Sequence, residues 1–450
     1  MIGETCLMHT SGCLKALLQT IWVERQSLIL RIAIAIMAVA AATFLAYEFW
    51  RLLFQTHWMG AVDLKQRYVE IEYLFSGGNP YRKIGTAMYP PASYVMLWPF
   101  LGWLEIDAAR WLWAISTIAL LALLSYLTVH MSRVDTPLLR AFVAMLPISM
   151  YATGATIGNG QLPIHCLTAL TIAIWLLQKT PRSWKEDSLI ACLFLFALVK
   201  PALIAPFFLI LLLRPGGIRP ALMVGIAYAA LTWFGSSFQE LDTLQFFADW
   251  QKRAATGVQW GNAKASGASG GTMPGVNIYG LTNVLGLLSA AGLGRWKLQA
   301  ALLILAGLGM WICFYRKVDI WVLAGVTAFG DRFWMYHLWY DDLVLLLPMI
   351  ALLRIVRQQS TAPRRSWQAG ILLVMTAAFT LAPGGLYLFP PPWNQVYVGL
   401  QTLLWLTGLT FLLQQARLEK RMLASGVMSR DDRTTRREAA AKLDSEPIGM

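Results

Sequence analysis

About a dozen apolar runs dominate this sequence and limit what it can fold into. The chain has 450 residues, of which 57% are hydrophobic and 14% charged, and its mean hydropathy is +0.54. Ordinary soluble domains do not reach these values. The runs occupy residues 28–50, 91–104, 109–131, 138–154, 161–178, 188–214, 221–234, 298–315, 318–329, 343–355, 368–388 and 396–413. They predict an all-α polytopic membrane protein.

The same runs define the expected domains. We expect a cytoplasmic N-terminus at 1–27, a transmembrane domain of about 11–13 helices at 28–414, and a basic, disordered cytoplasmic tail at 415–450. The run 188–214 is interrupted near its middle by Lys200 and Pro201, which predicts two half-helices that meet at Lys200.

Basic residues indicate the orientation. The net charge of +13 comes from short loops and from the last stretch of the chain, without a basic stripe of the kind that binds nucleic acid. If 91–104 dips into the membrane and returns, all the short basic loops and both termini fall on the cytoplasmic side. A full span at 91–104 is the alternative. The dipping arrangement predicts a multi-pass protein of the plasma membrane.

The opposite, outer face then collects the unusual segments. These are 60–82, GNGQ at 158–161, the Lys200 break, the loop 236–295 and DRFWMYHLWYDD at 331–342. Non-helical backbone at membrane depth persists only where it lines a wet cavity, so we expect a catalytic or binding chamber there. The loop 236–295, rich in Gly and Ser around ASGASGG, is either a gate for substrate or a flexible connector.

The first outer segment carries the strongest candidate for chemistry. From Asp63 onward Leu64, Tyr68, Ile71 and Phe75 share one helical face, and Gly77 and Gly78 end the pattern, which predicts an amphipathic helix at the membrane surface with Glu70 on another face. Asp63 at its start can cap the helix, with Gln66 in the capping-box position. The carboxylate can equally act as a general base in a wet pocket beside the bilayer.

Four stretches together resemble a known family. They are VDLKQRYVEIEYLFSGGNPY, MYPPASYVMLWP, GNGQ and ALVKPALIAPFFLILLLR. In their order they resemble glycosyltransferase family 87 of the GT-C superfamily. The resemblance implies a GT-C-type bundle and an inverting hexosyltransferase that uses a polyprenyl-phosphate sugar, commonly of mannose, with a lipid or glycan acceptor and membrane lipids around it. It assigns Asp63 as the base and adds Tyr68 to the substrate-binding set.

The late motif supplies further candidates. YDDLVLLLP resembles a late helix of the family that begins with an Asp. The phosphate of the leaving group needs cations, which Arg332 and Lys200 can provide, although Arg332 can instead pair with Asp331 or Asp342 and Lys200 can reach to the surface. His337 is assigned to catalysis or to an aromatic belt. The remaining candidates for sugar hydroxyls are Asn159, Gln161, Asp341 and Asp342; the two aspartates should face different ways because they are adjacent.

Two other functions stay open at this stage. A transporter or flippase for lipid-linked sugars predicts inverted repeats and midplane charges, and the sequence has no internal repeat. A membrane glycan polymerase predicts a large outer loop with several Arg and His, and 236–295 has no His. The sequence has no DxD motif and no GxxxxGK loop, so neither a metal nor another cofactor is implied.

Overall fold

The structure is a computed structural model. It describes residues 2–425 except 58, 241, 266–287, 289–291, 336, 358–362 and 391, and it leaves the side chains of 2–23, 256–265, 294 and 387 undescribed. Within that part of the chain the regular elements are helices, apart from one isolated bridge between Met150 and Leu381. The expected all-helical class is therefore confirmed.

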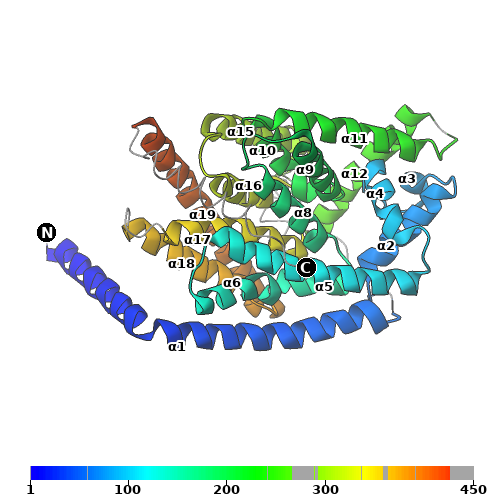
Figure 1. Cartoon of the computed structure of the whole chain (residues 1–450). Helices are drawn as coiled ribbons and strands as arrows, with labels where there is room; N and C mark the ends of the chain where they lie inside the picture. The colour runs from blue at the N-terminus through cyan, green and yellow to red at the C-terminus, as the bar shows by residue number, and fades with distance from the viewer. Residues whose placement is uncertain are drawn as a thin grey trace.

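The helices follow one another along the chain and pack into one bundle (Figure 1). They are α1 (Ile2–Phe54), α2 (Val62–Phe75), α3 (Pro80–Lys83), α4 (Pro91–Leu101), α5 (Ile106–Ser132), α6 (Pro137–Ser149), α7 (Tyr151–Asn159), α8 (Pro163–Leu176), α9 (Trp184–Ala197), α10 (Pro201–Leu213), α11 (Ile218–Ser236), α12 (Thr243–Ala265), η2 (Gly294–Trp296), α15 (Lys297–Tyr315), α16 (Ile320–Trp334), η3 (Trp339–Leu345), α17 (Leu346–Val356), α18 (Pro363–Thr380), η4 (Gly385–Leu388) and α19 (Trp393–Ala424).

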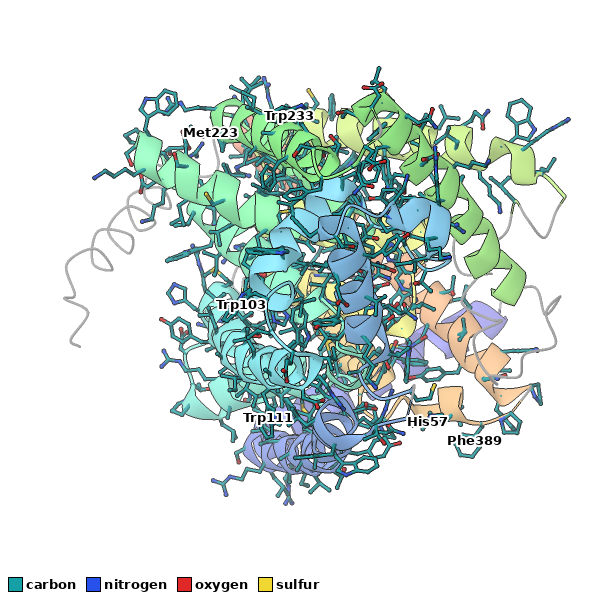
Figure 2. The ribbon with its side chains drawn as sticks, turned by 90° about the vertical axis from the view of Figure 1, so that its right-hand side faces the viewer. His57, Trp103, Trp111, Met223, Trp233 and Phe389 are labelled. Carbon is teal, nitrogen blue, oxygen red and sulfur yellow. The ribbon has the colours of Figure 1, made fainter. Side chains whose placement is uncertain are left out.

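Five stretches among the described helices are long and apolar enough to cross a membrane: Glu24–Phe54, Ile106–Ser132, Ile218–Ser236, Lys297–Tyr315 and Trp393–Ala424. Shorter apolar helices complete the bundle. Figure 1 shows α1 along its lower edge, beneath α5 and α6. Figure 2 shows Trp111 and Trp233 on the outside, where they are 50% and 65% exposed. Large exposed apolar side chains on long apolar helices are what a lipid-facing surface requires, and the chain is a multi-pass membrane protein.

The helix ends differ from the sequence expectations at three places. The run 138–154 is not one helix, because Met150 is extended between α6 and α7 and the Ala382 N–H donates to the Ser149 carbonyl at 2.8 Å. The run 91–104 yields the 11-residue helix α4. Helix α19 continues to Ala424, past the expected tail boundary at 415, and most of that tail lies outside the described residues.

The break at Lys200 is confirmed. Helix α9 ends at Ala197, α10 begins at Pro201, and Lys200 lies between them with non-helical backbone (φ −115°, ψ 78°). Proline has no N–H to continue a helix, but it is tolerated in a first turn, so Pro201 both ends one helix and starts the next.

The predicted amphipathic helix in the first outer segment is α2. Its apolar face is as expected, but the burial of two charged residues was not predicted. Leu64 and Ile71 are buried as predicted, but Arg67 and Glu70 are buried as well. Helix α2 therefore packs against α4 and carries an internal ion pair, while Glu72 remains exposed and Lys65 and Gln66 are partly exposed.

The loop 236–295 contains a long helix, α12, that is fixed to the first outer segment. Asp249 accepts hydrogen bonds from Asn79 at 2.9 Å and from Arg82 at 2.6 Å. Trp250 donates to the Met88 carbonyl at 3.1 Å and Arg253 to the Tyr81 carbonyl at 2.8 Å. The first half of the loop is thus not a free connector, while most of ASGASGG lies outside the described residues.

Candidate active site

Asp63 stands in the first turn of α2 but does not cap it. The N-cap is Ala61, in the left-handed region at φ 51°, and its backbone N–H donates to the Gly158 carbonyl at 3.1 Å. The carboxyl of Asp63 is half-buried and hydrogen-bonded to the side chain of Gln161. The local capping explanation for Asp63 therefore does not hold, and its partner comes from the GNGQ segment.

The charges around Asp63 oppose one another. Burial raises the pKa of Asp63 above its ordinary value, while the Gln161 hydrogen bond and the nearby cations Arg67 and Lys200 lower it, and Asp341 raises it again. These groups come from the start of α2, the end of α7, the Lys200 break and η3. Four helix ends thus converge on one carboxyl.

The two amide side chains of the GNGQ segment, Asn159 and Gln161, contact different partners. Helix α7 ends at Gly160, whose φ of 67° is a left-handed C-cap that glycine adopts without strain. The chain turns there so that the buried Gln161 faces Asp63. Asn159 instead accepts from Arg51 of α1 at 2.8 Å, and Arg51 also pairs with Glu48 at 2.6 Å. Gln161 belongs to the Asp63 site, whereas Asn159 joins two helices.

Lys200 and Asp341 form a buried ion pair, with side chains 8% and 5% exposed. The ammonium also lies 4.4 Å from the centre of the Tyr340 ring, a cation–π distance. Lys200 therefore does not extend to the surface. Asp341 is held further by the Leu338 N–H, which donates to its second oxygen at 3.0 Å.

His337 completes this group from the loop before η3. Its Nε2 donates to the backbone carbonyl of Asp331 at 2.8 Å, and its Nδ1 lies 3.6 Å from Asp341. Burial lowers the pKa of His337, but the carboxylates of Asp331 and Asp341 outweigh burial and raise it to about 9. His337 is therefore a cation at neutral pH, with both ring nitrogens engaged. Burial raises the pKa of Asp341, yet Lys200 and His337 outweigh it and hold that pKa below its ordinary value.

Arg332 and Asp342 lie in a second, completely buried network. Both side chains are 0% exposed and they pair with each other. Asp342 also accepts from the hydroxyl of Tyr151, and Gln401 of α19 donates to that hydroxyl at 3.3 Å. The adjacent aspartates thus face different partners, as expected. Arg332 is thus paired with Asp342, one of the two aspartates that the sequence offered as its partner.

Arg67 is the group at this site that sequence reasoning missed. Its guanidinium lies 4.4 Å from the centre of the Tyr89 ring and pairs with Glu70 at 2.7 Å, and Thr86 donates to the other oxygen of Glu70 at 2.9 Å. Because residues four apart share a helical face, Arg67 lies on the side of Asp63. That spacing, Asp63 followed by Arg67, was a signal available in the sequence.

Tyr68 is not part of the group. Its hydroxyl donates to the Leu104 carbonyl at 3.0 Å, which ties α2 to the turn between α4 and α5.

The fold defines a membrane protein in which helix ends bring charged side chains together in one buried cluster. Residues 87–329 match the model of glycosyltransferase family 87, more than half of the chain, and the protein belongs to that family. The match includes Tyr89, Gln161 and Lys200, but it ends before Asp341 and begins after Asp63. No curated protein and no solved structure matches the chain. The protein is thus a membrane glycosyltransferase, with a sugar donor and an acceptor as substrates.

Proposed function

We propose that this enzyme is an inverting hexosyltransferase that moves a mannose-like sugar from a polyprenyl-phosphate donor to a hydroxyl of a lipid or glycan acceptor. The observation that carries the proposal is the convergence of Asp63, Gln161, Lys200 and Asp341 from four helix ends in a chain of family 87. This cluster supplies a carboxylate, an amide and a cation, the three kinds of group that the reaction needs.

Asp63 is the general base. It takes the proton of the acceptor hydroxyl as the acceptor oxygen bonds to the anomeric carbon, and the bond from that carbon to the donor phosphate breaks. Polyprenyl phosphate leaves with the bonding electrons, and the anomeric centre inverts. Gln161, whose side chain is bonded to Asp63, is placed to meet a sugar hydroxyl as well.

Lys200 carries the charge stabilisation of the leaving phosphate. Its ammonium belongs to the same buried cluster as Asp63, and its charge lowers the pKa of Asp63. Asp341 holds the ammonium in place, and protonated His337 holds Asp341. His337 is accordingly a positioning residue. Arg332 stabilises η3 through its buried ion pair with Asp342.

The orientation follows from the basic loops. With the short basic loops in the cytoplasm, Asp63 and η3 lie on the outer side of the plasma membrane, where a lipid-linked donor is used and a sugar nucleotide is not. A cysteine introduced at Lys83, an exposed position of the first outer segment, and labelled from outside intact cells tests this side directly.

The test of the function is transfer in membranes that contain equal amounts of wild type, Asp63→Asn and Asp63→Glu. Radiolabelled polyprenyl-phosphate sugars are supplied, and both loss from the donor and gain in the acceptor are followed. We expect Asp63→Asn to lose about 10²- to 10⁴-fold of the rate while still binding donor, because only proton transfer is removed. Asp63→Glu should recover part of it.

The matched control is Asp107→Asn, which removes an exposed carboxylate at the start of α5, 81% exposed and paired with Arg110. It should leave transfer unchanged. Full activity of Asp63→Asn would refute Asp63 as the base. If wild type transfers no sugar from any lipid-linked donor, the proposed donor is wrong, and transport of such lipids becomes the next function to test.

A further inference from the structure

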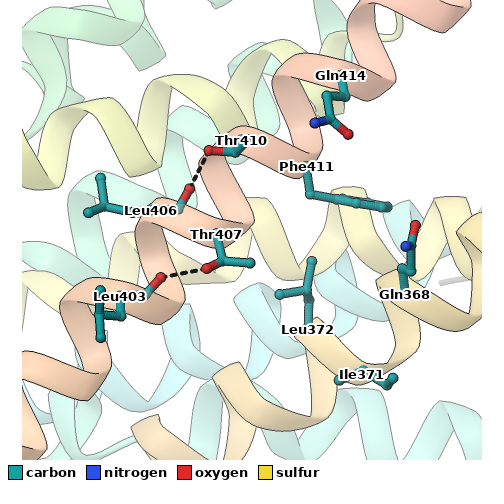
Figure 3. Close-up of a pocket in the computed structure, with 9 residues that line it drawn as sticks. All are labelled: Gln368, Ile371, Leu372, Leu403, Leu406, Thr407, Thr410, Phe411 and Gln414. Carbon is teal, nitrogen blue, oxygen red and sulfur yellow. Dashed lines mark hydrogen bonds between the residues drawn. The ribbon is translucent and has the colours of Figure 1, made fainter. Parts of the chain in front are cut away.

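A groove of about 500 Å³ lies between α18 and α19 (Figure 3). Its apolar walls are formed by Ile371 and Leu372 of α18 and by Leu403, Leu406 and Phe411 of α19. Leu403 and Leu406 are 62% and 44% exposed. Since α19 contains one of the five apolar stretches that can cross a membrane, the groove opens toward lipid.

The two threonine hydroxyls that line the groove already donate hydrogen bonds within α19. The hydroxyls of Thr407 and Thr410 donate to the carbonyls of Leu403 and Leu406 at 2.7 and 2.8 Å. From Leu403 to Gln414 the groove follows 11 residue steps of helix, about 16 Å. That length accommodates the first dozen or so carbons of an extended fatty-acyl chain.

One end of the groove is polar and basic. Gln368 and Gln414 line it, and Arg365 donates to Gln414 at 3.4 Å while its guanidinium lies 5.3 Å from the centre of the Phe411 ring. The other terminal nitrogen of Arg365, Nη1, is buried without a hydrogen-bond partner. Arg364 is exposed beside it, and none of the nine lining residues is acidic. A guanidinium nitrogen without an acceptor beside a second cation attracts an anion.

We propose that this groove binds an anionic phospholipid, with its phosphate at Arg365 and Gln414 and one acyl chain along Leu406 and Phe411. The basic end fits the charged headgroup and the apolar length fits the chain, and the two lie in the order in which a phospholipid presents them. The groove is distinct from the proposed transfer site, because none of its nine lining residues belongs to the Asp63, Lys200 or Asp342 networks.

The test uses the purified full-length protein in detergent, titrated with phosphatidylglycerol or phosphatidylcholine of identical acyl chains and followed by native mass spectrometry. We expect wild type to prefer phosphatidylglycerol about tenfold, the gain from one or two hydrogen bonds to a charged group. Arg365→Gln should remove most of this preference, and Arg365→Lys should keep part of it. Leu406→Trp, which fills the apolar part, should weaken binding of both lipids.

The control is Arg295→Gln, which changes an exposed arginine of η2 that does not line the groove. It should leave the preference intact. Equal binding of the two lipids by wild type, or an unchanged preference in Arg365→Gln, would overturn the proposal. A loss of preference in Arg295→Gln as large as in Arg365→Gln would do the same, since the effect would then come from overall charge.

Discussion

The buried ion pair of Lys200 and Asp341 offers the sharpest test of what stabilises the charged cluster. Their side chains are 8% and 5% exposed, so neither charge can turn to water when its partner is removed. Lys200→Met leaves the Asp341 carboxylate buried, with His337 as its remaining counter-charge. Removing one partner of a buried pair lowers the free energy of unfolding by about 3–5 kcal/mol. Asp341→Asn should have a smaller effect, because the Tyr340 ring still attracts the ammonium, which is worth about 0.5–2 kcal/mol.

The double variant shows whether the charges of Lys200 and Asp341 are energetically coupled. Lys200→Met combined with Asp341→Asn leaves neither member of the pair charged, and the carboxamide oxygen introduced at position 341 can still accept from the Leu338 N–H. We therefore expect it to be more stable than Lys200→Met alone, with a coupling free energy of about 2–3 kcal/mol in a double-mutant cycle. Unfolding by denaturant in detergent, followed by fluorescence of the 20 tryptophans, measures all four proteins. If the two single effects simply add, the pair is not coupled and the reasoning is wrong. Sugar transfer should be lost in every variant that lacks Lys200, whatever its stability.

Three further predictions concern Asp63, Arg332 and Tyr68. Activity needs Asp63 ionised and should fall as the pH drops through its raised pKa; Arg67→Gln removes a cation that lowers this pKa, so the acid limb of the pH–rate profile should move to higher pH. An unmoved limb would exclude an electrostatic role for Arg67. Arg332→Gln leaves Asp342 buried without its guanidinium and should destabilise the protein by about 3–5 kcal/mol, measured by the same denaturant unfolding. Tyr68→Phe removes one hydrogen bond and should cost about 1 kcal/mol of stability with no change in kcat; a large fall in kcat would place Tyr68 at the substrate.

The elements that sequence predicted well are those with a local cause. Pro201 cannot continue a helix, so the break at Lys200 was predictable from two residues. The divergence of Asp341 and Asp342 was predictable because adjacent residues on a helix face different directions. Neither observation required knowledge of what lies across the charged cluster.

The features that were missed depend on distant partners. The amphipathic pattern placed Glu70 away from the apolar face, and it is buried only because Arg67 and Thr86 satisfy its oxygens. The break at Met150 lies in a continuous apolar run, and the extended backbone there pairs with Leu381, far along the chain. A single sequence contains no local sign that Thr86 lies beside Glu70 or that Leu381 lies beside Met150.

The distance along the chain between Lys200 and Asp341 has a consequence for biosynthesis. They are 141 residues apart, which a ribosome adding about 5–20 residues per second takes roughly 7 to 28 seconds to cover. During that interval the ammonium of Lys200 lies between α9 and α10 without its carboxylate partner. The Lys200–Asp341 ion pair can therefore form only after η3 has been made. A chain that stops before Asp341 keeps the cation of Lys200 and lacks the carboxylate that neutralises it.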